Sequence, residues 1–211
     1  VNIMSKSLEL PLLPLDNVVV FPQCATVLIV TSKEEINTVN EAFSGSKTIF
    51  CVAKKSKSNF EKNGELESLY TTGVICEITQ VVDVNENEAR VFINCLDKAV
   101  LNSIIKDNGK YFCTITPLRK SRIKEDPQKI SEIKKIILSK AELFLKQNSK
   151  FPKDLFSLVK FLDRESDIIF VLANVLNLSI DVKQNILEER TTLEQLNRLC
   201  EYLEIELSLL E

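Results

Sequence analysis

The spacing of the apolar residues changes near residue 118, and this change constrains the fold more than any other feature of the sequence. Before it, short runs of β-branched and aromatic residues are broken by glycine and proline, and all 4 glycines lie there. After it, apolar residues recur at helical intervals, as at Ile133 and Ile137. The first pattern predicts strands and the second predicts helices. We therefore expect an α+β chain, with a β-rich unit over residues 8–118, a linker over 119–126 and a helical bundle over 127–211.

The first unit is expected to be a partly closed antiparallel β-barrel or sandwich with one helix. Ser32 and Glu35 form a capping box, which satisfies the free amides at a helix start, and the helix should run to about Phe43. Asn108-Gly109 favours a type I′ turn and predicts a hairpin. Prolines in the first runs favour edge or bent strands, because proline donates no ladder hydrogen bond. Strands are expected over residues 8–15, 18–21, 25–31, 48–53, 73–84, 89–96, 100–105 and 111–117.

The second unit is expected to be a helical bundle that ends in a long helix. Asp126, Ser179 and Thr191 are suitable caps for three of its helices. The last helix carries a heptad seam, which packs either on its own bundle or against another part of a larger assembly. No glycine or proline stops this helix, so we expect the natural chain to continue. The seam consists of Leu193, Leu196, Cys200, Leu203, Leu207 and Leu210.

The sequence lacks the residues that most self-contained catalysis requires. It has no histidine, which excludes a Ser-His-Asp or Cys-His arrangement and a histidine-ligated metal. The Gly109-Lys110 pair has Ile104 where a phosphate-binding loop needs glycine. The 6 cysteines lie scattered in apolar runs, which favours buried, reduced thiols. We therefore expect no catalytic, cofactor-binding or metal site in these residues.

Charge and hydropathy argue against nucleic-acid and membrane partners. The net charge is −3, and the basic run from Arg119 to Lys124 has no interleaved aromatic residue, so a solvated linker is favoured over a nucleic-acid site. The apolar run from Ile168 to Ala173 is far shorter than the roughly 20 residues that span a bilayer. It is typical of a buried helix.

The segment from Leu10 to Pro22, Leu-Pro-Leu-Leu-Pro-Leu-Asp-Asn-Val-Val-Val-Phe-Pro, resembles the opening of Lon proteases. In that family a proline-punctuated strand leads to a polar pair, an apolar triplet and Phe-Pro. The family usually has arginine where this chain has Asp16, and often glycine where it has Gln23. The stretches from Asp181 to Glu188 and from Arg198 to Leu210 resemble the family's helical subdomain. The resemblance thus covers essentially the whole chain.

This resemblance implies the amino-terminal substrate-recognition and assembly region of a Lon-type protease. Such proteases are homohexameric, ATP-dependent serine proteases that use a Ser-Lys dyad to degrade misfolded and regulatory proteins. ATP and Mg are implied for the full-length protein, whose ATPase and dyad lie outside these residues. The implied partners are unfolded or damaged proteins and the other domains of the same chain. The implied location is the bacterial cytoplasm, or the mitochondrial matrix in a eukaryote.

The proline-rich segment is the predicted substrate-binding site. Unfolded proteins expose apolar side chains, so a receptor needs an accessible apolar patch on a rigid scaffold. We predict that Pro14, Leu15, Phe21 and Pro22 form this patch; the alternative is that Leu15 and Phe21 pack inside the barrel. The residues predicted to make the interdomain or assembly contact are Leu196, Cys200, Leu203, Leu207 and Leu210.

Two other classes of function stay open. One is a protein-interaction module of the ligase-adaptor type, in which a Lon-like domain occurs without a protease. The other is an RNA-binding module, which the net charge of −3 disfavours. A Walker motif and a Ser-Lys protease domain in the same reading frame would identify the protease.

Overall fold

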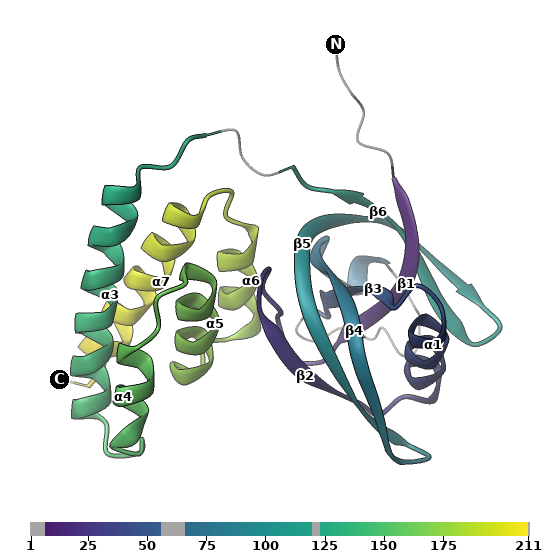
Figure 1. Ribbon diagram of the computed structural model, residues 1–211, viewed down its shortest axis with the longest axis horizontal. Coiled ribbons are helices and arrows are strands. Elements are labelled where there is room, and N and C mark those ends of the chain that lie inside the picture. Colours follow the sequence, from purple (N-terminus) through teal and green to yellow (C-terminus); the bar gives the residue numbers. More distant parts are fainter. Residues whose placement is uncertain (1–6, 56–65, 120–122, 211) are drawn as a thin grey trace. The chain divides into compact units, whose positions relative to one another are not determined.

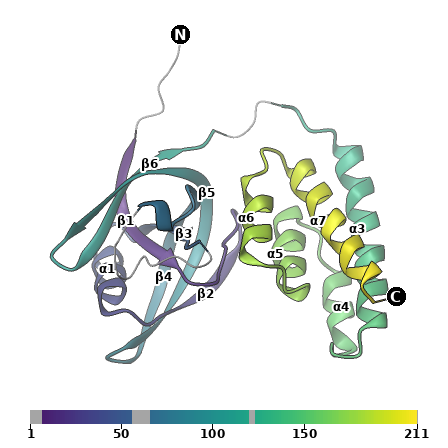
Figure 2. The same cartoon turned by 180° about the vertical axis from the view of Figure 1, so that it is seen from behind.

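The computed structural model describes residues 7–55, 66–119 and 123–210 (Figures 1 and 2). The chain divides into two compact units, one ending at Arg119 and the other following it. Residues 120–122 of the expected linker lie outside the described residues. The α+β class predicted from the change in apolar spacing is confirmed, since strands occupy the first unit and the second unit is helical.

The first unit is a curved six-stranded sheet against which the α-helix α1 (Lys33–Ser44) packs. The order along the sheet is β2-β5-β4-β3-β1-β6, and β5 also pairs with β6. This second pairing curls the sheet round without making it a closed barrel (Figure 1). A short 3₁₀ turn, Leu66–Ser68, precedes β4. The strands are β1 (Leu8–Leu15), β2 (Ala25–Val30), β3 (Thr48–Ala53), β4 (Thr72–Asn85), β5 (Glu88–Asp107) and β6 (Lys110–Pro117).

Strand β1 departs from the predicted all-antiparallel sheet. Its first half pairs antiparallel with β6, from Leu8 to Pro11, and its second half pairs parallel with β3, from Leu12 to Leu15. Each half therefore has a strand on one side only. This arrangement accommodates Pro11 and Pro14, because a backbone position that faces no partner needs no N–H donor.

Two of the sequence-based strand predictions are wrong. Residues 18–21 form a loop, because Val19, Val20 and Phe21 are all buried and do not alternate between two faces of a sheet. The predicted strands 89–96 and 100–105 are one continuous strand, β5, of 20 residues. Between Cys95 and Lys98, β5 advances three residues while β4 advances two from Val74 to Cys76, so a bulge bends the strand without ending it.

The interior of the curled sheet is filled by aliphatic and aromatic side chains from strands far apart in sequence. Thr38 joins α1 to this interior, because its hydroxyl donates to the Glu34 carbonyl at 2.8 Å and accepts from the Tyr111 amide at 3.1 Å. The core cluster contains Leu12, Phe50, Val52, Leu69, Ala99, Leu101, Tyr111, Cys113 and Ile115.

The second unit is built around two helices that run in the same direction. Helix α3 packs along α7, with the Leu193 amide donating to Glu125 at 2.8 Å near one end and a Lys140–Glu204 ion pair of 3.3 Å near the other. The predicted caps are confirmed: the Asp126 and Thr191 side chains accept from backbone amides at 2.9 and 3.1 Å. The helices are α3 (Pro127–Gln147), α4 (Asp154–Lys160), α5 (Glu165–Val175), α6 (Ile180–Glu188) and α7 (Thr192–Ser208).

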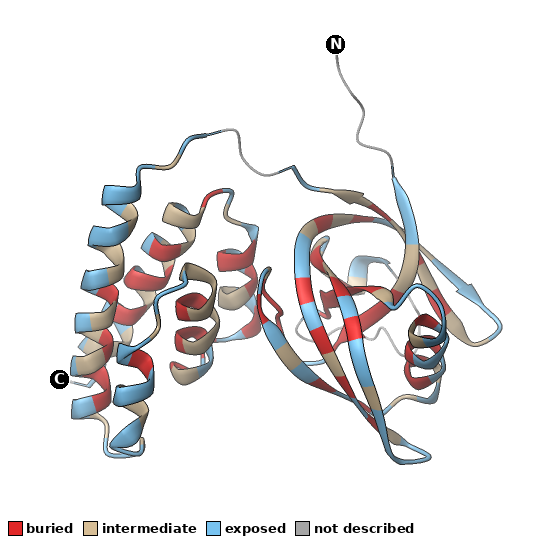
Figure 3. Cartoon of the chain, viewed as in Figure 1, coloured by how far each residue is buried: buried red, intermediate tan, exposed pale blue. Residues whose placement is uncertain are grey.

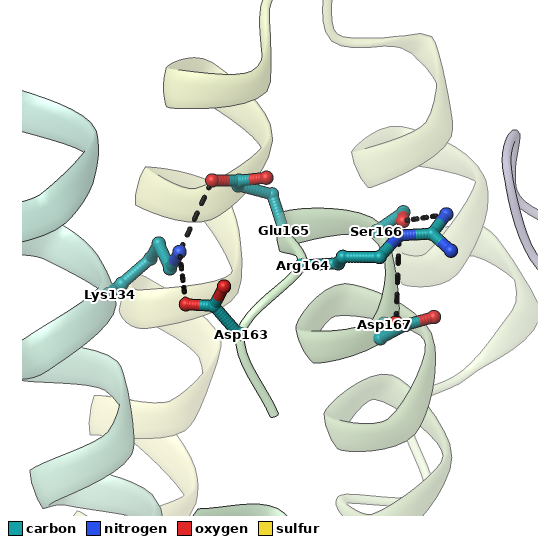
Figure 4. Close-up of polar contacts among 6 residues, drawn as sticks. All are labelled: Lys134, Asp163, Arg164, Glu165, Ser166 and Asp167. Atoms are coloured by element: carbon teal, nitrogen blue, oxygen red, sulfur yellow. Dashed lines mark hydrogen bonds and ion pairs between the residues drawn. The ribbon is translucent and has the colours of Figure 1, made fainter. Parts of the chain in front are cut away.

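Lys134 ties α3 to the start of α5 (Figure 4). Its ammonium lies 3.4 Å from Asp163 and 3.3 Å from Glu165. Burial opposes the charged form, but the bonds to the two carboxylates outweigh it and raise the pKa of Lys134. Arg164 turns away from this pair and bonds Ser166 at 3.3 Å (Figure 4). The two ion pairs of Lys134 therefore hold the start of α5 against α3.

We expect Gly73→Ala to destabilise the first unit by about 3 kcal/mol, because a new methyl group would be forced into a packed core. A Cβ at Gly73 would lie 2.4 Å from the Cys51 carbonyl oxygen and 2.6 Å from the Phe50 ring. Urea unfolding followed by circular dichroism measures the loss. Gly45→Ala is the matched control, since its nearest contact would be an ordinary 3.4 Å and its cost should stay below about 1 kcal/mol. Equal losses in the two variants would contradict the packing argument.

Candidate binding surface

The structure places three of the four predicted substrate-contacting residues in the interior. Pro14, Leu15 and Phe21 are buried, and Pro22 is half-buried. Leu15 and Phe21 thus follow the alternative stated above, in which both pack in the interior. Because a buried side chain offers no surface to a partner, these residues support the loop between β1 and β2 instead of forming an accessible patch.

A bulge connects that loop to β2. Gln23 and Cys24 both oppose Cys95 of β5: the Gln23 amide donates to the Cys95 carbonyl at 2.9 Å, and the Cys95 amide donates to the Cys24 carbonyl at 2.7 Å. Gln23 has a φ of 64°, the left-handed conformation of the first residue of a bulge that usually contains glycine there. The same backbone geometry accounts for the glycine that the resembling family often has at this position. The Gln23 side chain donates to the Leu96 carbonyl at 3.1 Å and adds a second tie to β5.

A buried ammonium group holds the other end of the loop. Lys54 is 7% exposed and lies 3.0 Å from Asp16 and 3.6 Å from Glu35, which is also buried. Asp16 follows β1, Glu35 lies in the first turn of α1, and Lys54 follows β3. One cation therefore joins three elements at the point where the loop begins.

We expect Lys54→Met to cost about 3 kcal/mol of unfolding free energy, because it leaves the buried Glu35 carboxylate without the ammonium group. Asp16→Asn should cost less than about 1 kcal/mol, since that side chain is 69% exposed and water screens its charge. Urea denaturation of both variants gives the comparison. The double variant Lys54→Met/Glu35→Gln should recover most of the loss. Comparable losses from the Asp16 and Lys54 changes would show that the surface pair, and not the buried one, carries the stability.

Accessible apolar side chains gather instead on the outer face of β2 and its neighbours. Along β2 exposed and buried residues alternate, so that Val27 and Ile29 are 45% and 64% exposed while Leu28 and Val30 are buried (Figure 3). In the register, Val27 lies beside Phe92 of β5. Ile29 lies beside Arg90 of β5, which in turn lies beside Val82 of β4. We call Val27, Ile29, Val82, Arg90 and Phe92 the β2 face.

The heptad residues of α7 divide between the interior and the surface of the helical unit. Leu196, Cys200 and Leu203 are buried, Leu207 is half-buried and Leu210 is 40% exposed. The first three therefore pack within their own bundle. Leu193 at the start of the seam is half-buried like Leu207, so the most accessible member is Leu210, which lies just beyond the end of α7. Other exposed apolar side chains of this unit are Ile136, Leu143, Leu158, Phe161, Ile205 and Leu209.

Two thiols of the first unit, those of Cys76 and Cys113, are held in their protonated form. All 6 cysteines are free and buried, as predicted from their apolar surroundings. Burial raises the pKa of Cys113 to about 12. Hydrogen bonds with Cys51 and Cys95, together with burial, raise the pKa of Cys76 as well. These groups stay protonated near neutral pH, and only the thiolate reacts.

The described part of the chain shows no cluster of three or more Cys, Asp or Glu side chains suited to a metal ion. Within the same residues, no helix has the length and apolar character needed to cross a membrane.

A curved α+β unit with an accessible apolar strand, joined to a helical unit, has the features of a protein-binding module. The chain belongs to the family of substrate-binding domains of ATP-dependent protease La (LON), which matches residues 9–204. It is 30% identical over 203 residues to a Lon protease of Syntrophomonas wolfei, covering 96% of this chain and 24% of that protein. It is 28% identical over 208 residues to the Lon protease of Escherichia coli K12, covering 98% of this chain and 26% of that protein. The chain thus spans about a quarter of the length of these relatives.

Two solved structures share the fold at 15% sequence identity. The N-terminal domain of Mycobacterium avium complex Lon protease superimposes with a TM-score of 0.67, covering 93% of this chain and 98% of that one. A Lon N-terminal domain protein from Xanthomonas campestris gives 0.62, covering 92% and 98%. The two-unit α+β architecture is therefore the fold of a Lon N-terminal domain.

Proposed function

We propose that this chain is the substrate-recognition and assembly region of a Lon-type ATP-dependent protease, and that the β2 face captures unfolded proteins. Family membership supports the general role, because the matching family is one of substrate-binding domains. The observation that supports the location is the exposure of Val27 and Ile29 on a strand whose opposite face is buried in the core.

The β2 face meets the physical requirements for capturing an unfolded chain. Its apolar side chains offer the contact that an exposed core segment of a substrate seeks, since burial of apolar area drives such association. The strand that carries them is held rigid by six consecutive pairs with β5, from Ala25–Asn94 to Val30–Ala89. Arg90 keeps the face partly polar and therefore limits indiscriminate self-association.

The proline-rich segment has a supporting role in this proposal. The interior position of Leu15 and Phe21 and the buried Lys54 ion pairs anchor the loop that leads to β2. A receptor surface built on an anchored strand loses less conformational entropy when it binds. Leu15 and Phe21, which were predicted to contact substrate, would thus position the β2 face instead.

The proposal extends to the whole protein. Its activity would be that of a serine endopeptidase with a Ser-Lys dyad, driven by ATP and Mg, with the dyad and the nucleotide site outside these residues. The helical unit would connect substrate capture to the ATPase part, and the exposed end of the α7 seam at Leu207 and Leu210 is suited to such a contact. We further propose a homohexamer that degrades misfolded and regulatory proteins in the bacterial cytoplasm, or in the mitochondrial matrix of a eukaryote.

We expect the double variant Val27→Thr/Ile29→Thr to weaken binding of an unfolded protein by about tenfold, because it removes apolar area from the β2 face while keeping β-branched side chains. Fluorescence anisotropy with a labelled protein that has been reduced and carboxymethylated, so that it cannot fold, measures the Kd.

The matched control is Ile105→Thr, which changes an exposed residue of β5 outside the β2 face. Its Kd should stay at the wild-type value, and all variants should keep their urea unfolding midpoint within a narrow range. An unchanged Kd for the double variant, with the fold intact, would rule out the β2 face as the capture surface.

A further inference from the structure

Strand β2 lies at an end of the sheet, so its backbone has a free edge. Among the described residues it pairs only with β5. The hydrogen bonds that Gln23 and Cys24 make with Cys95 fix which residues of β2 face that partner. In an antiparallel ladder, residues in hydrogen-bonded pairs alternate with residues whose amide and carbonyl groups point to the other side. Cys24 bonds β5, so every second residue after it does so too. These residues are Thr26, Leu28 and Val30.

The intervening residues of β2 therefore turn their amide and carbonyl groups toward the open edge. These residues are Ala25, Val27 and Ile29, and their side chains are the exposed ones of the strand. One set of residues thus presents both apolar side chains on the outer face and hydrogen-bonding groups along the edge. An extended polypeptide satisfies both at once, because its own backbone supplies the matching donors and acceptors.

The sequence of β2 also lacks the features that usually keep such an edge from pairing. Natural edge strands carry charged side chains or proline, which prevent the addition of a further strand. Strand β2 reads Ala-Thr-Val-Leu-Ile-Val and contains neither. By contrast, the paired strand β1 carries two prolines. An unprotected edge on a folded protein is a place where strand addition is favoured.

We propose that β2 binds an extended segment of an unfolded substrate as an added strand of the sheet. This inference rests on the proposed function and specifies its binding mode. The segment recognised has apolar side chains at alternate positions, which extend the β2 face, and backbone amides that pair with Val27 and Ile29. Selection then depends on an apolar alternation and a free backbone, not on a particular sequence.

The first test uses an eight-residue peptide of alternating valine and threonine and two N-methylated isomers of it, one methylated at every valine amide and one at every threonine amide. The three peptides have identical side chains, but each isomer has lost the donors along one edge only. In an added strand a single edge faces β2, so one isomer should bind at least about tenfold more weakly than the other, which should bind like the parent. Fluorescence anisotropy with the full 211-residue chain gives the three Kd values.

Each outcome separates the binding mode from the function. Equal affinity for the two isomers overturns strand addition, yet leaves capture through side chains intact if the carboxymethylated protein still binds. If that protein does not bind either, the proposed function itself fails. Dimerisation of the chain through β2 without peptide binding, seen by sedimentation, would assign the edge to a second copy and also overturn the proposal.

Hydrogen exchange followed by NMR gives an independent readout. The amides of Val27 and Ile29 point to the free edge and should exchange at least about tenfold more slowly at saturating parent peptide. The Thr26 and Leu28 amides already bond β5 and serve as internal controls with little change. Unaltered exchange at Val27 and Ile29 with the peptide bound would overturn strand addition.

Discussion

Strand β5 pairs with three other strands, and the arrangement of the first unit depends on it. Its first part lies between β2 and β4, and its last part pairs with β6. A straight strand of 20 residues could not pair with β2 and β4 at one end and with β6 at the other. Register shifts against β4 and β6 allow β5 to bend. The bend brings β6 back beside β1, so the inward side chains of all these strands meet in one core. The pairing also determines which strand is left at the end of the sheet.

That strand is β2, and its register decides what it presents to solvent. The bulge at Gln23 and Cys24 inserts one residue opposite Cys95, immediately before the strand begins. Side chains in a strand alternate between faces, so a slip of one residue would bury Val27 and Ile29 and expose Leu28 and Val30. A left-handed residue in the loop therefore controls which apolar side chains, and which backbone groups, reach the surface. The bulge at Gln23 and Cys24 thus determines both the pairing of β2 with β5 and the side chains that form the β2 face.

Much of the secondary structure could be predicted from the sequence, because caps and turns are local signals. Ser32, Asp126 and Thr191 each cap the helix that follows, and Asn108-Gly109 turns β5 into β6 as expected. The parallel pairing of β1 with β3 could not be predicted, since strand direction depends on contacts between distant segments. The same limitation affected the surface: the apolar run in residues 25–30 predicts a strand, but four consecutive apolar residues do not tell which face of that strand is covered. A Leu, Phe or Pro side chain near a sharp loop can be buried and anchor the loop, or it can be exposed in a binding surface. Phe21 is buried and anchors the loop.

The two departures from the family pattern in the loop have separate physical explanations. Asp16 stands where the family usually has arginine, and in this chain it lies 3.0 Å from Lys54, so a negative charge faces a positive one. Since Asp16 is largely exposed, the pair contributes little energy by itself, and Lys54 owes its place mainly to the buried Glu35. Gln23 stands where glycine is frequent and adopts glycine's backbone conformation, at a cost that its bond to the Leu96 carbonyl partly offsets. Asp16 and Gln23 lie near the two ends of the loop between β1 and β2. The loop leads into β2 in the register that exposes Val27 and Ile29.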